Sequence, residues 1–340
     1  MAVAPARPAR PQQILVTGAT GFIGRSLIAP LRAEGHLVRA TTRDLARAAG
    51  REEIAWVKAN LDVPEEVEAA LEGIDAAYYL VHGMGGGRHG FREADRRAAE
   101  IFAAAAARAG VRRIIYLGGV APSGEPSEHL ASRLEVGRVL RSGQVPTLEL
   151  RASLIIGVGS ASWQIVRDLA LRLPALVLPK WTESRTSPIA LEDVLIGLVR
   201  ALALEPPQSA WFDLPGPEVL NGREMLLKIA ELRGRYVPAL RVPVLSPSLS
   251  SWWLKLVTRA DFSLARELVL GFSCDLLPAD DRYWGLIGHR PSHTFGAAAR
   301  RALDSEPPPE GLSGIGGQLV EALIQSFGER LGRRRPPRDR

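Results

Sequence analysis

A strand-like run that leads directly into three spaced glycines is the feature that most constrains this chain. Residues 14–24 read Ile-Leu-Val-Thr-Gly-Ala-Thr-Gly-Phe-Ile-Gly, and a helical pattern follows them. We expect Gly18 to permit a tight turn, Gly21 to let the backbone approach a pyrophosphate, and Gly24 to let the helix pack closely on the strand. The amides that open this helix would offer N–H groups and a partial positive charge to the anion. The segment therefore predicts a dinucleotide-binding turn.

Strand and helix patterns alternate through the first 150 residues. The apolar runs typical of buried strands are Ile14–Thr17, Leu37–Thr42, Ile54–Lys58, Ala76–Val81, Arg113–Leu117 and Thr147–Arg151. The helical stretches between them are Phe22–Ala33, Glu65–Leu71, Phe91–Ala109 and His129–Arg141. Alternation with short connections produces βαβ units. The sequence thus predicts an α/β fold built on a Rossmann-type doubly wound parallel sheet.

The pattern is looser after Arg151 and predicts a smaller C-terminal α/β lobe. Its expected elements are helices at Trp163–Leu173, Leu191–Leu204 and residues 222–233, a strand at Trp211–Leu214, and an apolar segment at Leu249–Phe272. In this architecture we expect the second lobe to cover the reactive end of the cofactor and to supply the substrate pocket.

These patterns divide the chain into five segments. They are a disordered N-terminal tail (1–11), the dinucleotide-binding Rossmann core (12–156), a substrate lobe with late Rossmann elements (157–312), an amphipathic helix (313–332) and an Arg-rich tail (333–340). The C-terminal helix places its apolar residues on one face, so we expect it to dock on the body or on a second copy of the chain. Homo-oligomerisation and peripheral membrane contact both stay open.

The formal net charge of +6 comes from the two ends of the chain. Arginines in the first ten and last eight residues account for the excess, so the folded body has no basic surplus that would bind nucleic acid. Cys274 is the single cysteine, which excludes an intrachain disulfide and a cysteine-based zinc site. The histidines lack metal-ligand spacing, and no stretch reaches the ~20 apolar residues of a membrane span. We therefore expect a cytoplasmic protein without a metal site.

The residues at the end of the second predicted strand bear on the choice between NADP and NAD. A carboxylate there holds the ribose 2′-hydroxyl of NAD, whereas cations hold the 2′-phosphate of NADP. Arg43 falls at this strand end and Arg25 follows the glycine turn, where a planar guanidinium can contact a phosphate at two points. Asp44 either caps the next helix or serves NAD. NADP(H) is favoured over NAD(H).

The chain resembles the extended and atypical short-chain dehydrogenases, particularly bacterial NAD(P)H-binding proteins of the NmrA-like type. The resemblance covers about residues 12–303, nearly the whole body of the chain. The segments that carry it are Thr17–Gly24, Arg43, Asn60–Asp62, Tyr78–His82, Tyr116–Gly119, Leu150–Ser153 and Pro188–Asp193.

By this resemblance, Asp62 would accept a hydrogen bond from the adenine amino group, unless it caps the helix that starts near Pro64. Leu80 to His82 would line the adenosine ribose, and residues around 152–156 would flank the nicotinamide. Together with the turn, the predicted cofactor-binding residues are Gly18, Thr20, Gly21, Phe22, Ile23, Gly24, Arg25, Arg43, Asp62, Leu80, Val81, His82 and Gly118.

The chain departs from the superfamily at the catalytic positions. Relatives usually carry Tyr-x-x-x-Lys at the start of the helix after the fifth strand, whereas this chain reads His129-Leu-Ala-Ser-Arg133. His129 would donate a proton near neutral pH and Arg133 would hold a ribose hydroxyl; a surface pair on the helix is the alternative. Ser123 is either the carbonyl-polarising serine of relatives or a loop residue. Tyr116 lies within a strand and is expected in the core.

Two functions fit these observations. The first is an NADP(H)-dependent oxidoreductase acting on an apolar enone- or quinone-like small molecule, because such reductions depend less on a tyrosine acid than carbonyl reduction does. The second is a non-catalytic NAD(P)H-binding redox sensor or structural assembly module. A sugar-nucleotide epimerase is disfavoured, since its chemistry depends on Tyr-x-x-x-Lys. The tryptophans expected either beside the substrate or in the core are Trp163, Trp181, Trp252 and Trp253.

Overall fold

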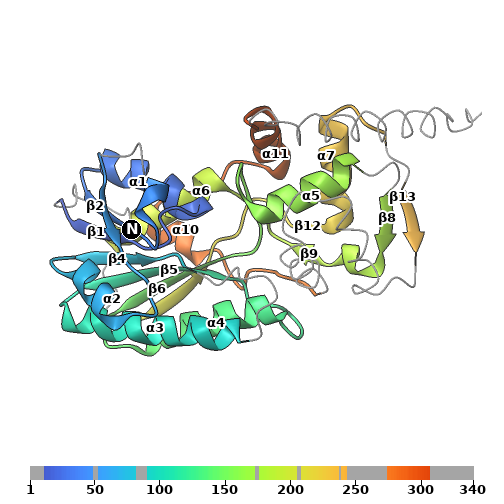
Figure 1. Cartoon of the computed structure of the whole chain (residues 1–340). Helices are drawn as coiled ribbons and strands as arrows, with labels where there is room; N and C mark the ends of the chain where they lie inside the picture. Colours follow the sequence, from blue (N-terminus) through green and yellow to red (C-terminus); the bar gives the residue numbers. More distant parts are fainter. Residues whose placement is uncertain are drawn as a thin grey trace, which may run out of the picture.

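A parallel seven-stranded sheet forms the centre of the larger of two lobes (Figure 1). The computed structural model describes residues 11–48, 53–81, 90–172, 176–204, 208–236, 239–242 and 274–306. The strands of this sheet are β1 (Gln13–Val16), β2 (Leu37–Thr42), β3 (Ala55–Lys58), β4 (Ala76–Tyr79), β5 (Arg113–Gly119), β6 (Thr147–Ala152) and β11 (Ala210–Asp213). They lie in the order β11-β6-β5-β4-β1-β2-β3.

The order of the strands reverses beside β1. This strand pairs in parallel with β2 on one side and with β4 on the other, so that Ile14 lies opposite both Val38 and Ala76. At such a reversal the connections leave toward opposite faces, and a crevice opens at the carboxyl ends of the strands. The predicted Rossmann-type doubly wound sheet is therefore confirmed.

Helices cover both faces of the sheet. Those on one face are α2 (Pro64–Leu71), α3 (Phe91–Arg108) and α4 (Glu128–Ser142), and those on the other are α1 (Phe22–Ala33), α6 (Leu191–Arg200) and α10 (Arg282–Ile287) (Figure 1). Alternate residues of β1 belong to the two layers: Ile14 shares a core with Leu27 of α1, whereas Leu15 shares one with Phe102 of α3. Because both faces are covered, the strands are apolar on both sides, which explains the unbroken apolar runs in the sequence.

The smaller lobe is built from helices and two-stranded sheets. Its elements are α5 (Ala161–Arg172), α7 (Gly222–Leu232) and α11 (Phe295–Asp304), with the strand pairs β7 (Ile155–Ile156) and β10 (Ile189–Ala190), β9 (Arg185–Thr186) and β12 (Leu220–Asn221), and β8 (Leu176–Pro179) and β13 (Ala239–Val242). Its helices enclose a separate core that contains Trp163, Met225 and Phe295. Trp163 is only 1% exposed, so it is a core residue and does not line a substrate pocket. The side chain of Trp181 and all of Trp252 and Trp253 lie outside the described residues.

The chain returns to the larger lobe after the smaller one has begun. α6 packs beside α1, β11 adds an edge strand next to β6, and Gly197 of α6 leaves room for the ring of Trp284 in α10. The residue ranges 1–10 and 307–340, which include the predicted C-terminal helix and Arg-rich tail, lie outside the described part. Among the helices that the structure describes, none is long and apolar enough to span a membrane.

Candidate functional site

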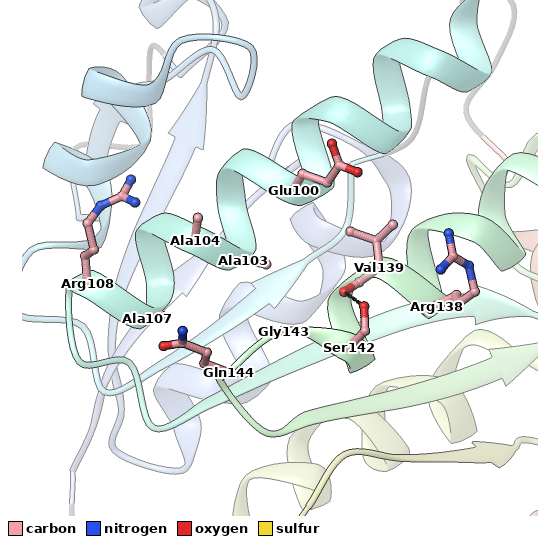
Figure 2. A pocket seen from close by; sticks show the side chains of 10 residues that line it. All are labelled: Glu100, Ala103, Ala104, Ala107, Arg108, Arg138, Val139, Ser142, Gly143 and Gln144. Carbon is pink, nitrogen blue, oxygen red and sulfur yellow. Dashed lines mark hydrogen bonds between the residues drawn. The ribbon is translucent and has the colours of Figure 1, made fainter.

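A cavity of about 290 Å³ lies at the carboxyl ends of β1, β4, β5 and β6. Its wall consists of the glycine turn after β1, Leu80 after β4, the end of β5, the start of α4, residues between 152 and 162, and Leu276. A larger hollow of about 570 Å³ lies between α3 and α4, lined mostly by short side chains (Figure 2). We assign the functional site to the smaller cavity, because ligands of open parallel sheets bind at the carboxyl ends of the strands.

The glycines of the turn have distinct steric roles. Gly18 has a φ of +63°, and a Cβ at this position would lie 2.6 Å from the carbonyl oxygen of Leu80. A Cβ on Gly24 would clash with the Gly18 carbonyl and with Ala19, so this glycine lets α1 pack on the turn rather than on the strand. Gly21 lines the cavity. The tight turn expected at Gly18 is present. Gly24 was expected to let the helix pack on the strand, but it packs against the turn instead.

The start of α1 presents backbone N–H groups to the cavity. The first intrahelical hydrogen bond runs from the amide of Arg25 to the carbonyl of Gly21 at 3.0 Å. The amides of Phe22, Ile23 and Gly24 precede it, no side chain caps the helix, and all three residues line the cavity. Uncapped amides and the helix dipole together favour an anion at this position. The arrangement fits the diphosphate of a dinucleotide.

Hydrogen bonds of Thr17 connect the turn to the end of β4. Its fully buried hydroxyl donates to the Tyr78 carbonyl at 3.0 Å and accepts the Leu80 amide at 3.0 Å. The turn after β1 and the segment after β4 therefore form one wall of the cavity. Leu80 lines this wall, and Val81 lies close to the turn, whereas His82 lies outside the described residues.

The cations predicted to hold a 2′-phosphate stand outside the cavity wall. Arg43 is exposed directly after β2, and Arg25 is exposed with its guanidinium beside Gly159 in the loop before α5. Asp44 caps a short 3-10 helix, because its Oδ1 accepts the amide two residues further on at 3.0 Å. Of the two roles that the sequence left open for Asp44, the capping role is the one that the structure contains.

Asp62 is exposed and does not cap the helix that follows it. The N-cap of α2 is Val63, and no side chain caps this helix. The Asp62 carboxylate makes no hydrogen bond within the described residues, while its amide donates to Asn60 Oδ1 at 3.3 Å. The carboxylate is therefore open to a ligand. Neither Asp62 nor Thr20, which is partly exposed, belongs to the cavity wall.

Two neighbouring glycines of β5 face opposite sides. Gly119 lines the cavity, and a Cβ there would press on the side chain of Leu130. A Cβ on Gly118 would instead lie 2.8 Å from Oε1 of Glu149, away from the wall. Because successive strand residues alternate between faces, Gly119 lines the cavity, whereas Gly118, which was predicted to bind the cofactor, does not.

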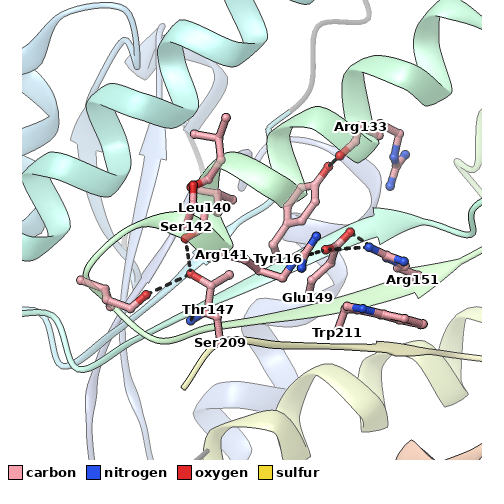
Figure 3. A network of polar contacts seen from close by, with 12 residues as sticks. Tyr116, Arg133, Leu140, Arg141, Ser142, Thr147, Glu149, Arg151, Ser209 and Trp211 are labelled. Atoms are coloured by element: carbon pink, nitrogen blue, oxygen red, sulfur yellow. Dashed lines mark hydrogen bonds and ion pairs between the residues drawn. The ribbon is translucent and has the colours of Figure 1, made fainter. Parts of the chain in front are cut away.

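A buried ion-pair network holds α4 against the sheet (Figure 3). The fully buried carboxylate of Glu149 accepts hydrogen bonds from Arg141 Nε at 2.7 Å and from Arg151 Nε at 2.9 Å. The Arg151 guanidinium also stacks 4.3 Å from the ring centre of Trp211. Gly137 of α4 has no side chain and leaves room for this carboxylate. The network thus sets the distance of α4 from β5, β6 and β11.

His129 lies in the first turn of α4 and lines the cavity. Burial, reinforced by the positive charge of Arg133, lowers the pKa of His129 to about 4. The imidazole is therefore uncharged at neutral pH and offers an N–H donor instead of an acidic imidazolium. A ring that is uncharged at neutral pH is not the imidazolium acid that the sequence predicted. The alternative of an exposed surface pair is also wrong, because both residues line the cavity.

Hydrogen bonds join Arg133 of α4 to β5 (Figure 3). Its Nη2 donates to the Leu117 carbonyl at 2.9 Å, and the Tyr116 hydroxyl donates to the Arg133 carbonyl at 2.9 Å. Tyr116 is 2% exposed, so its role is structural. Nε of Arg133 is buried without a partner in the described residues and lies 3.8 Å from where a Cβ on Gly119 would stand. An unsatisfied buried donor is costly, so a ligand oxygen at this wall would stabilise it.

Ser123 is exposed in the loop before α4, and its amide donates to the carbonyl of Asp275 at 3.0 Å. It does not line the cavity, so the loop alternative holds. Sequence reasoning missed Leu276, which carries no local signal because it reaches the wall from a distant segment. It also missed three serines of the wall, of which the one just before α4 has the signal of an N-cap; they are Ser127, Ser160 and Ser162. Ser153, which lies in the segment expected to flank the nicotinamide, also lines the wall.

Comparison with known proteins finds a family that matches part of this chain. Residues 18–167 match the family of NAD(P)H-binding domains. Ceramide reductase of Caulobacter vibrioides is 30% identical over 190 residues, which are 55% of this chain and 59% of that protein. Sterol demethylase protein B of Methylococcus capsulatus is 32% identical over 125 residues, or 34% of this chain and 38% of that protein. The chain thus spans less than two thirds of these two relatives.

Other similar proteins are covered more fully. The 3-diazoavenalumate denitrifying reductase of a Streptomyces species is 27% identical over 278 residues, which are 71% of this chain and 88% of that protein. The structure of a Citrobacter triphenylmethane reductase with NADP(H) superposes with a TM-score of 0.68 at 17% identity, covering 85% of this chain and 99% of that one. A short-chain dehydrogenase/reductase superfamily protein of Agrobacterium tumefaciens with bound NAD gives 0.61 at 18% identity, covering 92% and 99%. These structural likenesses show the fold.

Proposed function

We propose that this chain, which matches an NAD(P)H-binding family over residues 18–167, is an NADP(H)-dependent oxidoreductase of the atypical short-chain dehydrogenase type that reduces an apolar enone- or quinone-like small molecule. One observation carries the proposal. A single cavity joins the uncapped amides of α1 to the face of α4 that bears His129 and Arg133. A dinucleotide whose diphosphate lies on those amides can therefore place its reactive ring near these two side chains.

Three groups could contact a nicotinamide dinucleotide, two of them in the cavity wall and the third, Asp62, outside it. The amides of Phe22 to Gly24 would hold the diphosphate, and the open carboxylate of Asp62 would accept the adenine amino group. The unsatisfied Nε of Arg133 would donate to a ribose hydroxyl. The reduced dinucleotide would supply a hydride equivalent when bound.

NADP(H) is supported over NAD(H) by the residues after β2. The Asp44 carboxylate is engaged in a helix cap, while the guanidinium groups of Arg43 and Arg25 stand exposed and accessible to a phosphate. Arg43→Ala is expected to weaken NADPH binding about tenfold, or 1.4 kcal/mol, and to leave NADH binding unchanged. Titration of both dinucleotides by fluorescence tests this. Equal losses of affinity for NADPH and NADH would contradict the proposed preference for NADP(H).

The ionisable groups of the wall favour an acceptor that needs no strong acid. Within the described part of the wall, His129 and Arg133 are the only ionisable side chains. As a hydride adds to a conjugated ketone or a quinone, negative charge develops on its oxygen. The Arg133 cation and the His129 N–H can stabilise that charge, and water can then protonate the enolate or hydroquinone anion.

The rest of the wall favours an apolar acceptor. Leu117, Val120, Leu130, Leu154 and Ile155 line the cavity near α4. The names of the similar proteins agree with this chemistry: several are reductases, and ceramide and triphenylmethane compounds are largely apolar. The apolar wall and these names together support the substrate class.

The test is steady-state oxidation of NADPH with benzoquinone, naphthoquinone and cyclohexenone as acceptors. We expect turnover with at least one acceptor, a loss of about 100-fold in kcat/KM for Arg133→Ala, and partial recovery for Arg133→Lys, which keeps the charge. Urea unfolding of each variant controls for stability, because Arg133 also bonds to Leu117. Tight NADPH binding without oxidation of NADPH by any acceptor would contradict the proposal.

That contrary result would favour the second candidate, a non-catalytic NAD(P)H-binding redox sensor or assembly module. The uncharged state of His129 and the absence of a tyrosine from the described part of the wall support this candidate. A sensor has to bind the reduced and oxidised dinucleotides with different affinities, since a ligand shifts an equilibrium only by its differential affinity. The ratio of the dissociation constants for NADPH and NADP⁺ therefore measures this difference in affinity directly.

A further inference from the structure

A short segment from the C-terminal part of the chain, residues 274–279, contributes to the cavity wall. We call it the strap. Its backbone is joined to the loop before α4, because the carbonyl of Asp275 accepts the amide of Ser123 at 3.0 Å. The Cys274 side chain contacts the same loop, with Sγ 3.8 Å from the carbonyl oxygen of Glu125. The strap therefore lies beside the loop that leads to His129.

Hydrogen bonds to Arg185 and to Asp213 hold the strap in position. The Asp275 carboxylate accepts the backbone amide of Arg185 at 2.7 Å and its guanidinium Nη2 at 2.7 Å, while the Leu276 amide donates to the Arg185 carbonyl at 2.8 Å. At the other end of the strap, the Ala279 amide donates to Asp213 Oδ2 at 2.6 Å. The strap is thus fastened to β9 and to the end of β11.

This fastening directs one side chain of the strap into the cavity. Leu276 forms a β-bridge with Thr186, and its side chain lines the cavity together with Val120 and Leu130. The neighbouring Asp275 carboxylate is engaged outside the wall with Arg185. Leu276 is therefore an apolar part of the wall that comes from outside the strands and the glycine turn of the dinucleotide-binding fold.

We propose that Leu276 determines which size of ring the cavity accepts beside His129, a proposal that rests on the reductase function given above. The dinucleotide end of the cavity is made of the glycine turn, Leu80 and the start of α1, none of which contacts the strap through a described hydrogen bond. A change at Leu276 can therefore alter the space for the acceptor without altering the contacts that bind the diphosphate.

The expected magnitude follows from the behaviour of apolar pockets. One methylene in such a pocket changes discrimination between substrates by about 10- to 200-fold. Leu276→Ala removes more than one methylene, and Leu276→Trp fills the same space. The two substitutions should shift selectivity in opposite directions.

The experiment compares benzoquinone, naphthoquinone and anthraquinone with the full-length protein and NADPH. We expect Leu276→Ala to raise the ratio of kcat/KM for the larger over the smaller quinones at least tenfold, and Leu276→Trp to lower it by a similar factor. NADPH affinity should stay within about twofold in both variants. Leu286→Ala is the matched control, because that leucine of α10 is exposed and does not line the cavity.

A binding measurement separates this proposal from the reductase proposal. The affinities of the three quinones for the NADP⁺-loaded protein are measured by calorimetry, which does not depend on turnover. Size selectivity of binding that moves with residue 276 supports the role of Leu276 even if no quinone is reduced, and in that case only the reductase function is lost. Unchanged selectivity in turnover and binding, or a parallel loss of NADPH affinity, would overturn the role of Leu276.

Discussion

The phosphate end of the cavity comes mainly from one short stretch, between Gly18 and Gly24, whereas the end at α4 is assembled from segments that are far apart in the chain. At the phosphate end the contacts offered to a ligand are backbone amides of a helix start. At the α4 end they are side chains, those of His129, Arg133 and Leu276, and each depends on neighbours from other elements.

This difference predicts how each end responds to substitution. Backbone amides keep their positions as long as the local turn forms, so substitutions that leave the turn intact should alter cofactor affinity without altering stability. Side chains at the α4 end depend on the buried carboxylate of Glu149, which holds their helix on the sheet. Substitutions of Glu149 or of its partners should therefore lower stability more than they lower cofactor affinity.

The largest expected effect is the loss of this support. Glu149→Ala leaves Arg141 and Arg151 without their buried partner, which is expected to lower the free energy of unfolding by about 3–5 kcal/mol. Glu149→Gln should cost less, since the amide fills the same space and keeps hydrogen bonds. Urea unfolding measures both. Glu135→Ala on the same helix is the control, because its partner Arg92 is exposed and such pairs contribute about 0–1 kcal/mol. Equal losses for the Glu149 and Glu135 variants would show that the network does not support α4.

At the phosphate end, Gly21→Asp should weaken NADPH binding about 100-fold, or 2.7 kcal/mol. Gly21 is the N-cap of α1, where aspartate is a favoured residue, so the variant should keep its fold while its carboxylate engages the amides and repels the diphosphate. Gly21→Ser supplies a neutral cap and should weaken binding less. NADPH fluorescence titration gives the affinities, and thermal melting checks the fold. A serine variant as weak as the aspartate variant would point to steric exclusion and away from the charge.

The pKa of His129 predicts a pH-dependent stability at the α4 end. In the fold this pKa is lowered from 6.5 to about 4, so the unfolded chain takes up a proton before the native protein does as the pH falls. The contribution of the neutral ring is complete above pH 6.5 and declines between 6.5 and 4, by about 3 kcal/mol in all. Unfolding free energies of wild type and His129→Gln, measured across this range, should converge toward low pH. Parallel curves would mean that the native ring titrates normally.

The smallest effect is expected at the strap. Asp275→Asn removes the charge that pairs with Arg185, whose side chain is 58% exposed, so the pair should contribute about 0–1 kcal/mol and be weakened by salt. We expect about a twofold loss of the selectivity between large and small quinones at low salt and a smaller loss at high salt. NADPH affinity should not change. A change in NADPH affinity would show that the strap also supports the phosphate end.

Much of the fold could be predicted because its signals are local. The strands β2 and β6 and the helix α1 begin where the apolar runs and the helical periodicity begin. The two-residue strands of the smaller lobe were missed, because a strand as short as β9 or β12 has no period to detect. The capping by Asp44 and the opposite directions of Gly118 and Gly119 needed coordinates, since each depends on which atoms lie across from the residue.

The doubly wound sheet and the glycine turn could be read from neighbouring residues, because both follow from the conformations of consecutive residues and the periodicity of apolar side chains. Three features required the folded chain: the neutral ring of His129, the Arg133 N–H that has no partner among the described residues, and the contribution of Leu276 to the wall. Burial, and contacts between segments that are distant in the chain, set the electrostatics and shape of this end of the cavity. Such quantities are properties of packing and appear in no stretch of neighbouring residues.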